Sequence, residues 1–149
     1  MIFVLAILIG FAAGLRAMTP VAAVAWGAYL GWIDLSATPL AFLGTLIAVI
    51  IVSLVAVVEL VTDQLPTTPS RKVPMQFGAR VVMGALTGAL LMPANWIIGA
   101  LLGAIGAVAG TLLGAELRAR LAISAGTRPA AFIEDALAII LAFGVVYLA

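Results

Sequence analysis

Residues 39–62 read PLAFLGTLIAVIIVSLVAVVELVT and contain one charged side chain, that of Glu59. A helix that crosses a bilayer needs about 20 mostly apolar residues, and this stretch is long enough. Its many β-branched residues would suit a strand in water, but a lone strand in lipid leaves its backbone hydrogen bonds unmade. The stretch therefore predicts a membrane-spanning helix.

The whole chain shares this apolar character. Its 149 residues are 66% hydrophobic and 9% charged, with a mean hydropathy of +1.34. A soluble domain carries about 25% charged residues. This chain has too little polar surface to cover itself, so we expect lipid to be its solvent. Length and composition predict an all-α bundle of transmembrane helices that forms a single domain over residues 1–149.

Prolines, glycines and polar residues divide the chain into six expected helices. These cover residues 2–15, 20–33, 39–62, 78–92, 96–123 and 129–148. Thr19 and Asn95 are the expected caps, and Pro20 and Pro129 the expected first residues, of the helices that follow them. The first helix would extend only about 21 Å. It therefore either spans the membrane, is re-entrant, or is fused with the second helix to give five spans.

The basic residues predict the orientation. They occur at Arg16, in residues 71–80 and in residues 118–128, which six spans place on one side. By the positive-inside rule that side is the cytoplasm, so loops 63–80 and 116–130 are expected there. Aromatic residues that would form a belt at the other interface are Trp32, Trp96 and Tyr147.

Glycines four residues apart mark the expected packing faces. The pairs and runs are Gly10/Gly14, Gly27/Gly31, Gly84/Gly88, Gly99/Gly103 and Gly106/Gly110/Gly114. In lipid, helices associate by close backbone approach, which glycine permits. Packing within one bundle is favoured, and a homodimer or a larger membrane complex held by these Gly-xxx-Gly faces is the alternative. The glycine face of residues 96–123 is expected to be the most buried surface.

A weak internal similarity suggests a parallel repeat of helical hairpins. Gly14-x-Arg16 resembles Gly78-x-Arg80, and Glu59 resembles Glu116 in its position after a long uncharged stretch. Transporters contain parallel repeats of this kind. Chance matching in an apolar chain is an equally good explanation.

Several classes of site are disfavoured by composition. The chain has no Cys and no His, which excludes thiolate chemistry and removes the commonest metal ligand. The net charge is +1 without a basic stripe, so nucleic acid is not an expected partner. We expect no metal and no cofactor. Because no catalytic motif is present, an enzyme is disfavoured but left open.

Polar residues expected at the cytoplasmic end form the candidate ligand-binding cluster. Its members are Arg16, Glu59, Asp63, Thr68, Ser70, Arg71, Arg80, Glu116, Arg128, Glu134 and Asp135. Charges at membrane depth cost about 2.5–3.5 kcal/mol each on insertion scales, so acidic residues there need a reason. For Glu134 and Asp135, the dipole at the start of the last helix is one such reason.

Two ion pairs are predicted by spacing. Glu59 and Asp63 are four residues apart and would repel on one helix face, so Arg16 or Arg80 is expected between them. Glu116 is expected to pair with Arg120 four residues later. The remaining basic residues near these helix ends, Lys72, Arg118 and Arg120, are interpreted chiefly as determinants of topology.

The proline-rich loop holds the hydroxyls of Thr68 and Ser70 beside Arg71. These groups could form an anion-binding turn, although a stiff connector is the favoured interpretation.

Four segments carry a resemblance to a known family. They are Gly14-Leu15-Arg16-Ala17-Met18-Thr19-Pro20, Glu59…Asp63-x-Leu65-Pro66-x-Thr68-Pro69-Ser70-Arg71, Gly78-x-Arg80 and Glu134-Asp135-Ala136-Leu137-Ala138. With these segments the chain resembles small bacterial membrane proteins classed as domain of unknown function 4126. The resemblance implies a membrane location and no activity. Together with the predicted spans and orientation, it leads us to expect a multi-pass protein of the bacterial inner membrane.

Three functions are compatible with these features. A transporter or channel-like protein for a small solute or ion is favoured by the polar cluster and the broken first hairpin, although no ionisable residue is expected near the midplane. An accessory or structural subunit of a membrane complex is the second possibility. The third is a protein that binds anionic lipid headgroups, using Arg16, Arg71, Arg80 and Glu59.

Overall fold

The computed structural model describes residues 1–64 and 73–149. These residues form six α-helices and two short 3-10 helices, and the described part of the chain contains no strand. The α-helices are α1 (Ile2–Leu15), α2 (Met18–Tyr29), α3 (Leu46–Thr62), α4 (Pro74–Leu91), α5 (Trp96–Ala125) and α6 (Thr127–Leu148). The expected all-helical fold is confirmed, and α1 and α2 are separate helices rather than one fused span.

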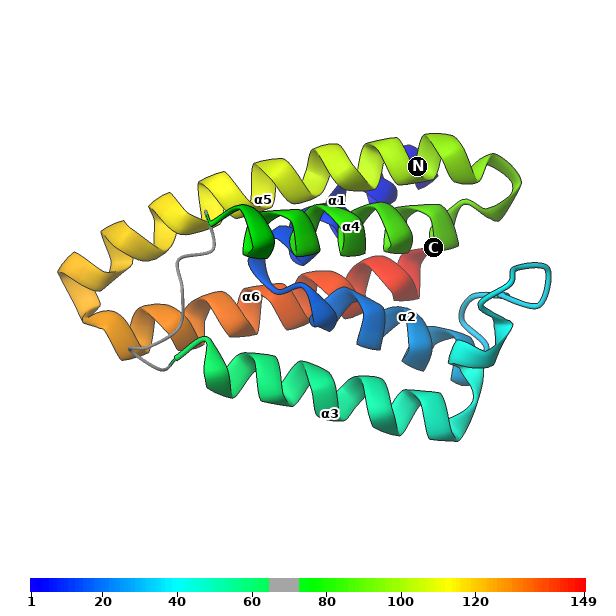
Figure 1. Cartoon of the computed structure of the whole chain (residues 1–149), viewed down its shortest axis with the longest axis horizontal. Coiled ribbons are helices and arrows are strands. Elements are labelled where there is room, and N and C mark those ends of the chain that lie inside the picture. Colours follow the sequence, from blue (N-terminus) through cyan, green and yellow to red (C-terminus); the bar gives the residue numbers. More distant parts are fainter. Residues whose placement is uncertain (65–72) are drawn as a thin grey trace.

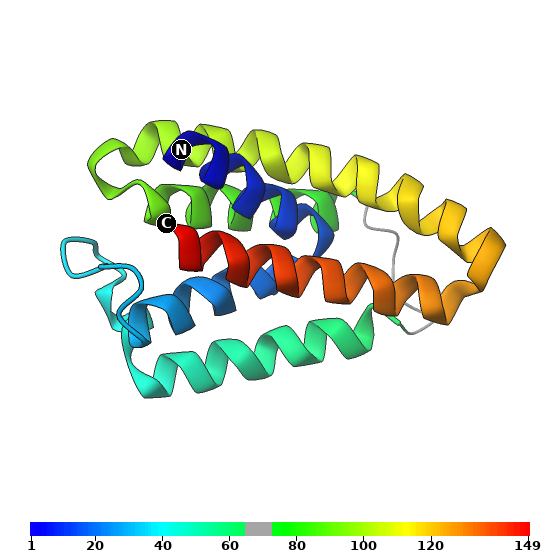
Figure 2. The same ribbon diagram turned by 180° about the vertical axis from the view of Figure 1, so that it is seen from behind.

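The helices lie roughly along one axis, with α5 as the longest (Figure 1). Helix α1 packs against α4 and α5, while α6 contacts α1, α2 and α5. Helix α3 lies at the edge of the bundle and packs mainly on α2. Figure 2 shows the same arrangement from behind, with the N-terminus, the C-terminus and the end of α2 at one end of the molecule.

Helices α1 and α2 form a short hairpin that turns back inside the bundle. Both views show α1 running inward from the end that holds the termini, and α2 returning to that same end (Figures 1 and 2). The two helices have 14 and 12 residues, or about 21 and 18 Å of helix. Their junction at Arg16 and Ala17 breaks the helical backbone, and Arg16 is buried there.

Glycine determines how closely α1, α4 and α5 approach. The buried face of α5 contains Gly99, Gly103, Gly106, Gly110 and Gly114, as expected. A Cβ atom on Gly84 would lie 2.7 Å from the carbonyl oxygen of Gly103, and one on Gly106 would lie 2.9 Å from the backbone nitrogen of Phe11. These faces are occupied by packing within the chain. Association of two copies stays a prediction.

Gly31 differs from this pattern. It has a φ of 77°, and nothing lies within 4 Å of the position of its Cβ. Gly31 therefore serves the turn that ends α2 rather than a packing face. The chain then forms an irregular loop, in which the backbone N–H of Ser36 donates to the Asp34 carboxylate at 2.8 Å and lowers the pKa of that group.

Several expected helix ends are wrong. Helix α2 begins at Met18 with Ala17 as its N-cap, so Thr19 is not the cap. Pro20 and Pro129 occupy third rather than first positions, which proline also tolerates because the first four N–H groups of a helix lack intrahelical partners. Asn95 is the N-cap of α5, but its side chain makes no capping hydrogen bond.

Two further boundaries differ. Helix α3 begins at Leu46 rather than residue 39, because Thr45 caps it by accepting from the backbone N–H of Ala48 at 3.3 Å. The preceding residues form the 3-10 helix Ala41–Gly44. Helix α4 begins at Pro74 rather than Gly78, with the proline in the first helical position.

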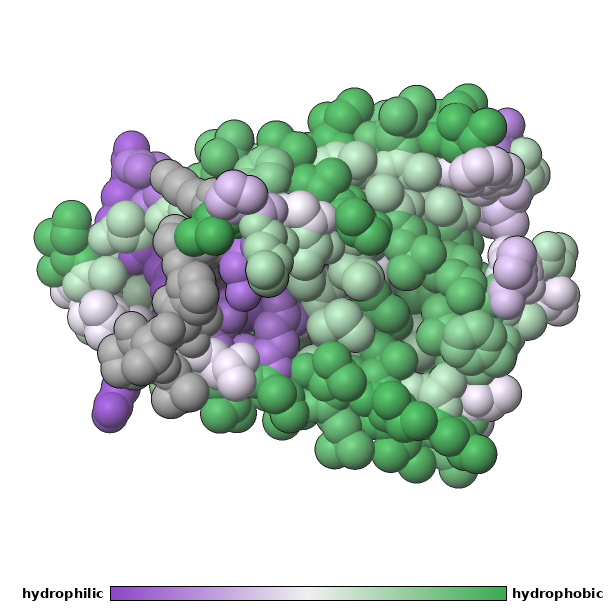
Figure 3. Space-filling view, viewed as in Figure 1, coloured by the Kyte–Doolittle hydropathy of each residue, from purple (hydrophilic) through white to green (hydrophobic). Residues whose placement is uncertain are grey.

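Within the described ranges, two helical stretches are long and apolar enough to cross a membrane, Pro93–Ala125 and Thr127–Leu148. Helices α1 and α3 are apolar but shorter. Apolar side chains cover much of the surface, and hydrophilic ones gather towards the end where α5 turns into α6 (Figure 3).

Candidate functional site

The break between α1 and α2 is set by local sequence. Helix α1 ends at Leu15, and Arg16 is extended, with φ −143° and ψ 116°. If the helix continued through this point, the ring of Pro20 would clash with the carbonyl group of Arg16. The break leaves a helix C-terminus and a helix N-terminus side by side, with backbone groups that need partners.

Side chains from other helices supply those partners. Arg80 of α4 donates from Nη1 to the carbonyl oxygens of Leu15 and Gly14, the latter at 3.1 Å. Glu59 of α3 accepts from the backbone N–H groups of Ala17 and Met18 at 2.7 and 2.8 Å. A cation thus faces the negative end of α1, and an anion faces the positive end of α2, as the helix dipoles favour.

Arg16 itself lies at the junction and is completely buried. Its Nε donates to Asp135 Oδ1 at 2.6 Å, and its Nη1 pairs with Asp63. A carboxylate oxygen of Glu134 lies 4.0 Å from Nη2. A buried charge is tolerated only when it is paired, and Arg16 meets this condition with carboxylates from α6 and the end of α3.

Asp63 joins the two buried arginines. Its Oδ2 contacts Arg16 and lies 3.1 Å from Nη2 of Arg80, while Glu59 lies 4.0 Å from the same nitrogen. Of the two candidate cations, Arg80 contacts both Glu59 and Asp63 and so lies between them, whereas Arg16 pairs with Asp63 and with the carboxylates of α6. We call these six residues the charge network: Arg16, Glu59, Asp63, Arg80, Glu134 and Asp135.

Two residues at the edge of the charge network were not predicted. Arg118 donates to Glu134 at 3.4 Å and to the backbone oxygen of Asp63 at 3.2 Å. Gln64 donates to Asp135 at 3.2 Å. Arg118 continues the four-residue spacing of the buried glycines of α5, four positions after Gly114. That spacing could have identified it as inward-facing rather than as a determinant of topology only.

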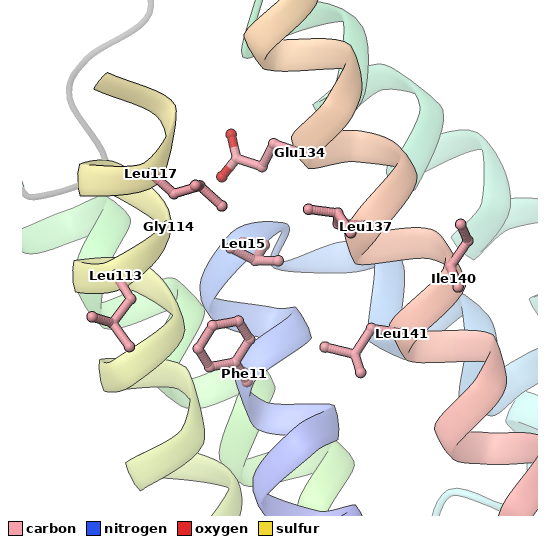
Figure 4. Close-up of a pocket in the computed structure, with 9 residues that line it drawn as sticks. All are labelled: Phe11, Leu15, Leu113, Gly114, Leu117, Glu134, Leu137, Ile140 and Leu141. Atoms are coloured by element: carbon pink, nitrogen blue, oxygen red, sulfur yellow. The ribbon is translucent and has the colours of Figure 1, made fainter. Parts of the chain in front are cut away.

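Next to the charge network, an apolar groove opens between α5 and α6. Its volume is about 380 Å³, and Figure 4 shows its lining: Phe11, Leu15, Leu113, Gly114, Leu117, Glu134, Leu137, Ile140 and Leu141. Phe11 and Leu15 of α1 form its floor. Glu134 is the one ionisable residue among these nine, and it lies at one end of the groove.

The family model for a domain of unknown function, DUF4126, matches residues 3–149. The chain belongs to the DUF4126 family. The resemblance drawn from its sequence segments is thereby confirmed. No curated protein and no solved structure matches the chain. The family description assigns no activity to this DUF4126 protein.

Other predicted members of the cluster lie elsewhere in this DUF4126 protein. Glu116 pairs with Arg120 at 2.7 Å as expected, but both side chains are exposed, unlike the buried groups of the charge network. Arg128 is exposed at the start of α6. Thr68, Ser70 and Arg71 lie outside the described residues, and so does the proposed anion-binding turn.

The repeat is not supported by the motifs that suggested it. Arg16 follows the last residue of α1, whereas Arg80 lies inside α4. Glu59 belongs to the charge network, whereas Glu116 is exposed. The paired motifs therefore occupy different structural positions.

No metal centre is evident in the part of the chain that the structure describes. Residues 1–64 and 73–149 contain no group of three or more acidic side chains that could hold a metal ion together.

Proposed function

We propose that this DUF4126 protein is a multi-pass protein of the bacterial inner membrane, and that it is a transporter or channel-like protein for a small ion or solute. In this proposal the charge network closes the cytoplasmic end of the pathway. The observation that carries it is the hairpin of two short helices whose inner ends meet at buried arginines and carboxylates.

Helix α3 supports the membrane location. Its large side chains are mostly exposed, including Ile47 at 72% and Leu54 at 62%. Only Val49 and Ala56 of this helix are buried. An apolar helix exposed on nearly all sides is costly in water and favourable in lipid.

The two ends of the bundle support the orientation. The charge network lies towards the end where α5 turns into α6, and Arg118, Arg120 and Arg128 belong to this part of the chain. Of the expected cytoplasmic loops, residues 74–80 lie in α4 and residues 116–125 lie in α5, so both stretches are largely helical. At the opposite end, the rings of Trp32 and Tyr147 make an edge-on contact with centroids 5.2 Å apart. Basic residues on the cytoplasmic side and an aromatic belt on the other match the usual pattern.

The broken hairpin supports a transport role. In membranes, helix ends at depth are tolerated where protein or a water-filled cavity covers them, and transporters place binding sites at such breaks. Here the helix ends are bonded by Glu59 and Arg80, and Arg16 lies between them. Opening a path along this junction would require those charged groups to exchange partners, which is the behaviour of a gate.

Asp63→Asn tests the gate. The substitution neutralises the carboxylate shared by Arg16 and Arg80 and should open the closed end. In planar bilayers with KCl, we expect the variant to raise conductance well above that of the wild type. Glu116→Gln, in an exposed ion pair, is the matched control and should behave as the wild type. If the Asp63→Asn protein is folded but conducts no more than the control, the proposal that the charge network is a gate is contradicted.

A role as an accessory subunit is the second candidate, and helix α3 favours it. The exposed apolar face of α3 could contact another membrane protein as well as lipid. Stoichiometric co-purification with a larger complex, lost on Leu54→Trp, would support this role. Binding of an anionic headgroup by Arg16 and Arg80 is weakened as an alternative, because both arginines are buried and already bonded to carboxylates of the chain.

A further inference from the structure

The groove between α5 and α6 has the form of a site for a hydrocarbon chain. Leu141 lies seven positions after Glu134 on α6, so the groove runs for about 10 Å along this helix. Its walls are leucines, Leu113 and Leu117 on α5 and Leu137 and Leu141 on α6 (Figure 4). A groove with this lining offers a polar ligand almost no hydrogen-bond partners along its length.

The charges at one end of the groove distinguish between amphiphiles. The Glu134 side chain is only 3% exposed, and its Oε2 lies 3.4 Å from Nη1 of Arg118, which is 27% exposed. A guanidinium and a carboxylate are therefore adjacent where a headgroup would lie. A headgroup that is only anionic would be repelled by the carboxylate of Glu134. One that is only cationic would be repelled by the guanidinium group of Arg118. A zwitterionic headgroup can satisfy both.

We propose that this groove binds one acyl chain of phosphatidylethanolamine, with the lipid's ammonium group at Glu134 and its phosphate at Arg118. The inference rests on the proposed membrane location. The groove opens between α5 and α6, whose wall residues Leu113 and Leu137 are exposed at 60% and 45%, so an acyl chain can enter sideways from the bilayer. The headgroup then lies towards the end where α5 turns into α6, where a membrane interface would be.

A lipid competition tests this proposal. The purified protein, depleted of lipid, is reconstituted with equal amounts of phosphatidylethanolamine and phosphatidylglycerol that have the same acyl chains, and retained lipid is measured by native mass spectrometry. We expect one phosphatidylethanolamine per protein, retained about tenfold more than phosphatidylglycerol, as the loss of one charge-assisted hydrogen bond implies. Equal retention of the two lipids, or retention of neither, would overturn the proposal.

Single substitutions test the binding of the acyl chain and the binding of the headgroup separately. Leu137→Trp fills the groove and should abolish retention, whereas Ile139→Trp, two residues along α6 and outside the lining, should leave it unchanged. Arg118→Gln should remove the preference between the two lipids. Retention by Leu137→Trp equal to that of Ile139→Trp would contradict binding in the groove.

Membrane insertion is measured on the same vesicles by resistance to alkaline extraction. If the protein resists alkaline extraction but shows no preference between the two lipids, the lipid site alone is overturned. Protein that is extracted by alkali would overturn the proposed function together with this site.

Discussion

The carboxylate of Glu59 accepts a hydrogen bond of 2.8 Å from the backbone N–H of Met18, 41 positions earlier in the chain. With the parallel bond from Ala17, it caps helix α2 from a different helix. Capping residues normally lie immediately before the helix that they cap. Here the cap comes from α3, so the start of α2 depends on the tertiary structure.

Glu59→Gln should therefore destabilise the protein. The amide keeps the shape of the side chain but removes the negative charge that faces the end of α2 and Arg80. Removing one partner from a largely buried ion pair costs about 3 kcal/mol. Thermal unfolding in detergent should show a clear fall in Tm.

The control for this change is Glu116→Gln, which breaks an exposed pair with Arg120. Exposed pairs contribute about 0–1 kcal/mol, so its Tm should stay close to that of the wild type. If the two glutamine variants unfold at the same temperature, Glu59 does not act as the remote cap.

Arg16→Lys should also lower Tm, although it keeps the positive charge. The planar guanidinium group of Arg16 contacts Asp63 and Asp135 at the same time. The ammonium group of lysine cannot reproduce that geometry. The loss of one charge-assisted hydrogen bond corresponds to about 1.5–3 kcal/mol. Arg120→Lys at the exposed pair is the matched change and should be nearly neutral. Equal stability of the two lysine variants would argue against a bidentate role for Arg16.

Gly103→Ala should disrupt the contact between α4 and α5. A Cβ atom at this position would lie 2.9 Å from the carbonyl carbon of Gly84, and backbone cannot move away easily. Overpacking of this kind costs about 1–3 kcal/mol. In Gly144→Ala, nothing lies within 4 Å of the new atom, so Tm should be unchanged or slightly higher. A Gly103→Ala protein as stable as Gly144→Ala would contradict the close packing of these helices.

The number and order of the helices could be predicted from the sequence. Long apolar stretches separated by prolines and polar loops define helices, and residues 2–15 give the observed bounds of α1. Residues 39–62 predicted α3 with its correct end but with a start seven residues too early. The glycine spacing also predicted the buried face of α5, because spacing by four places residues on one side of a helix. Both signals are local and periodic, which is why they can be read from the chain.

The details of the site depended on contacts between distant residues. Thr19 looked like the cap of α2 because it precedes Pro20, but Glu59 supplies the hydrogen bonds instead. The pairing of Arg16 with Asp135 joins residues 119 positions apart, which no local pattern indicates. Sequence spacing did predict that Arg16 or Arg80 would separate Glu59 from Asp63, because like charges four residues apart need a cation.

The most direct test of the proposed membrane bundle is its topology. The chain has no cysteine, so Asn95→Cys and Ser124→Cys each introduce one thiol into a background without others. Both positions are exposed, at opposite ends of α5. A membrane-impermeant maleimide should label Asn95→Cys from the outside of bacterial spheroplasts, and Ser124→Cys only in inverted vesicles. Labelling of both positions from the same side would contradict a bundle whose charge network lies at the cytoplasmic end.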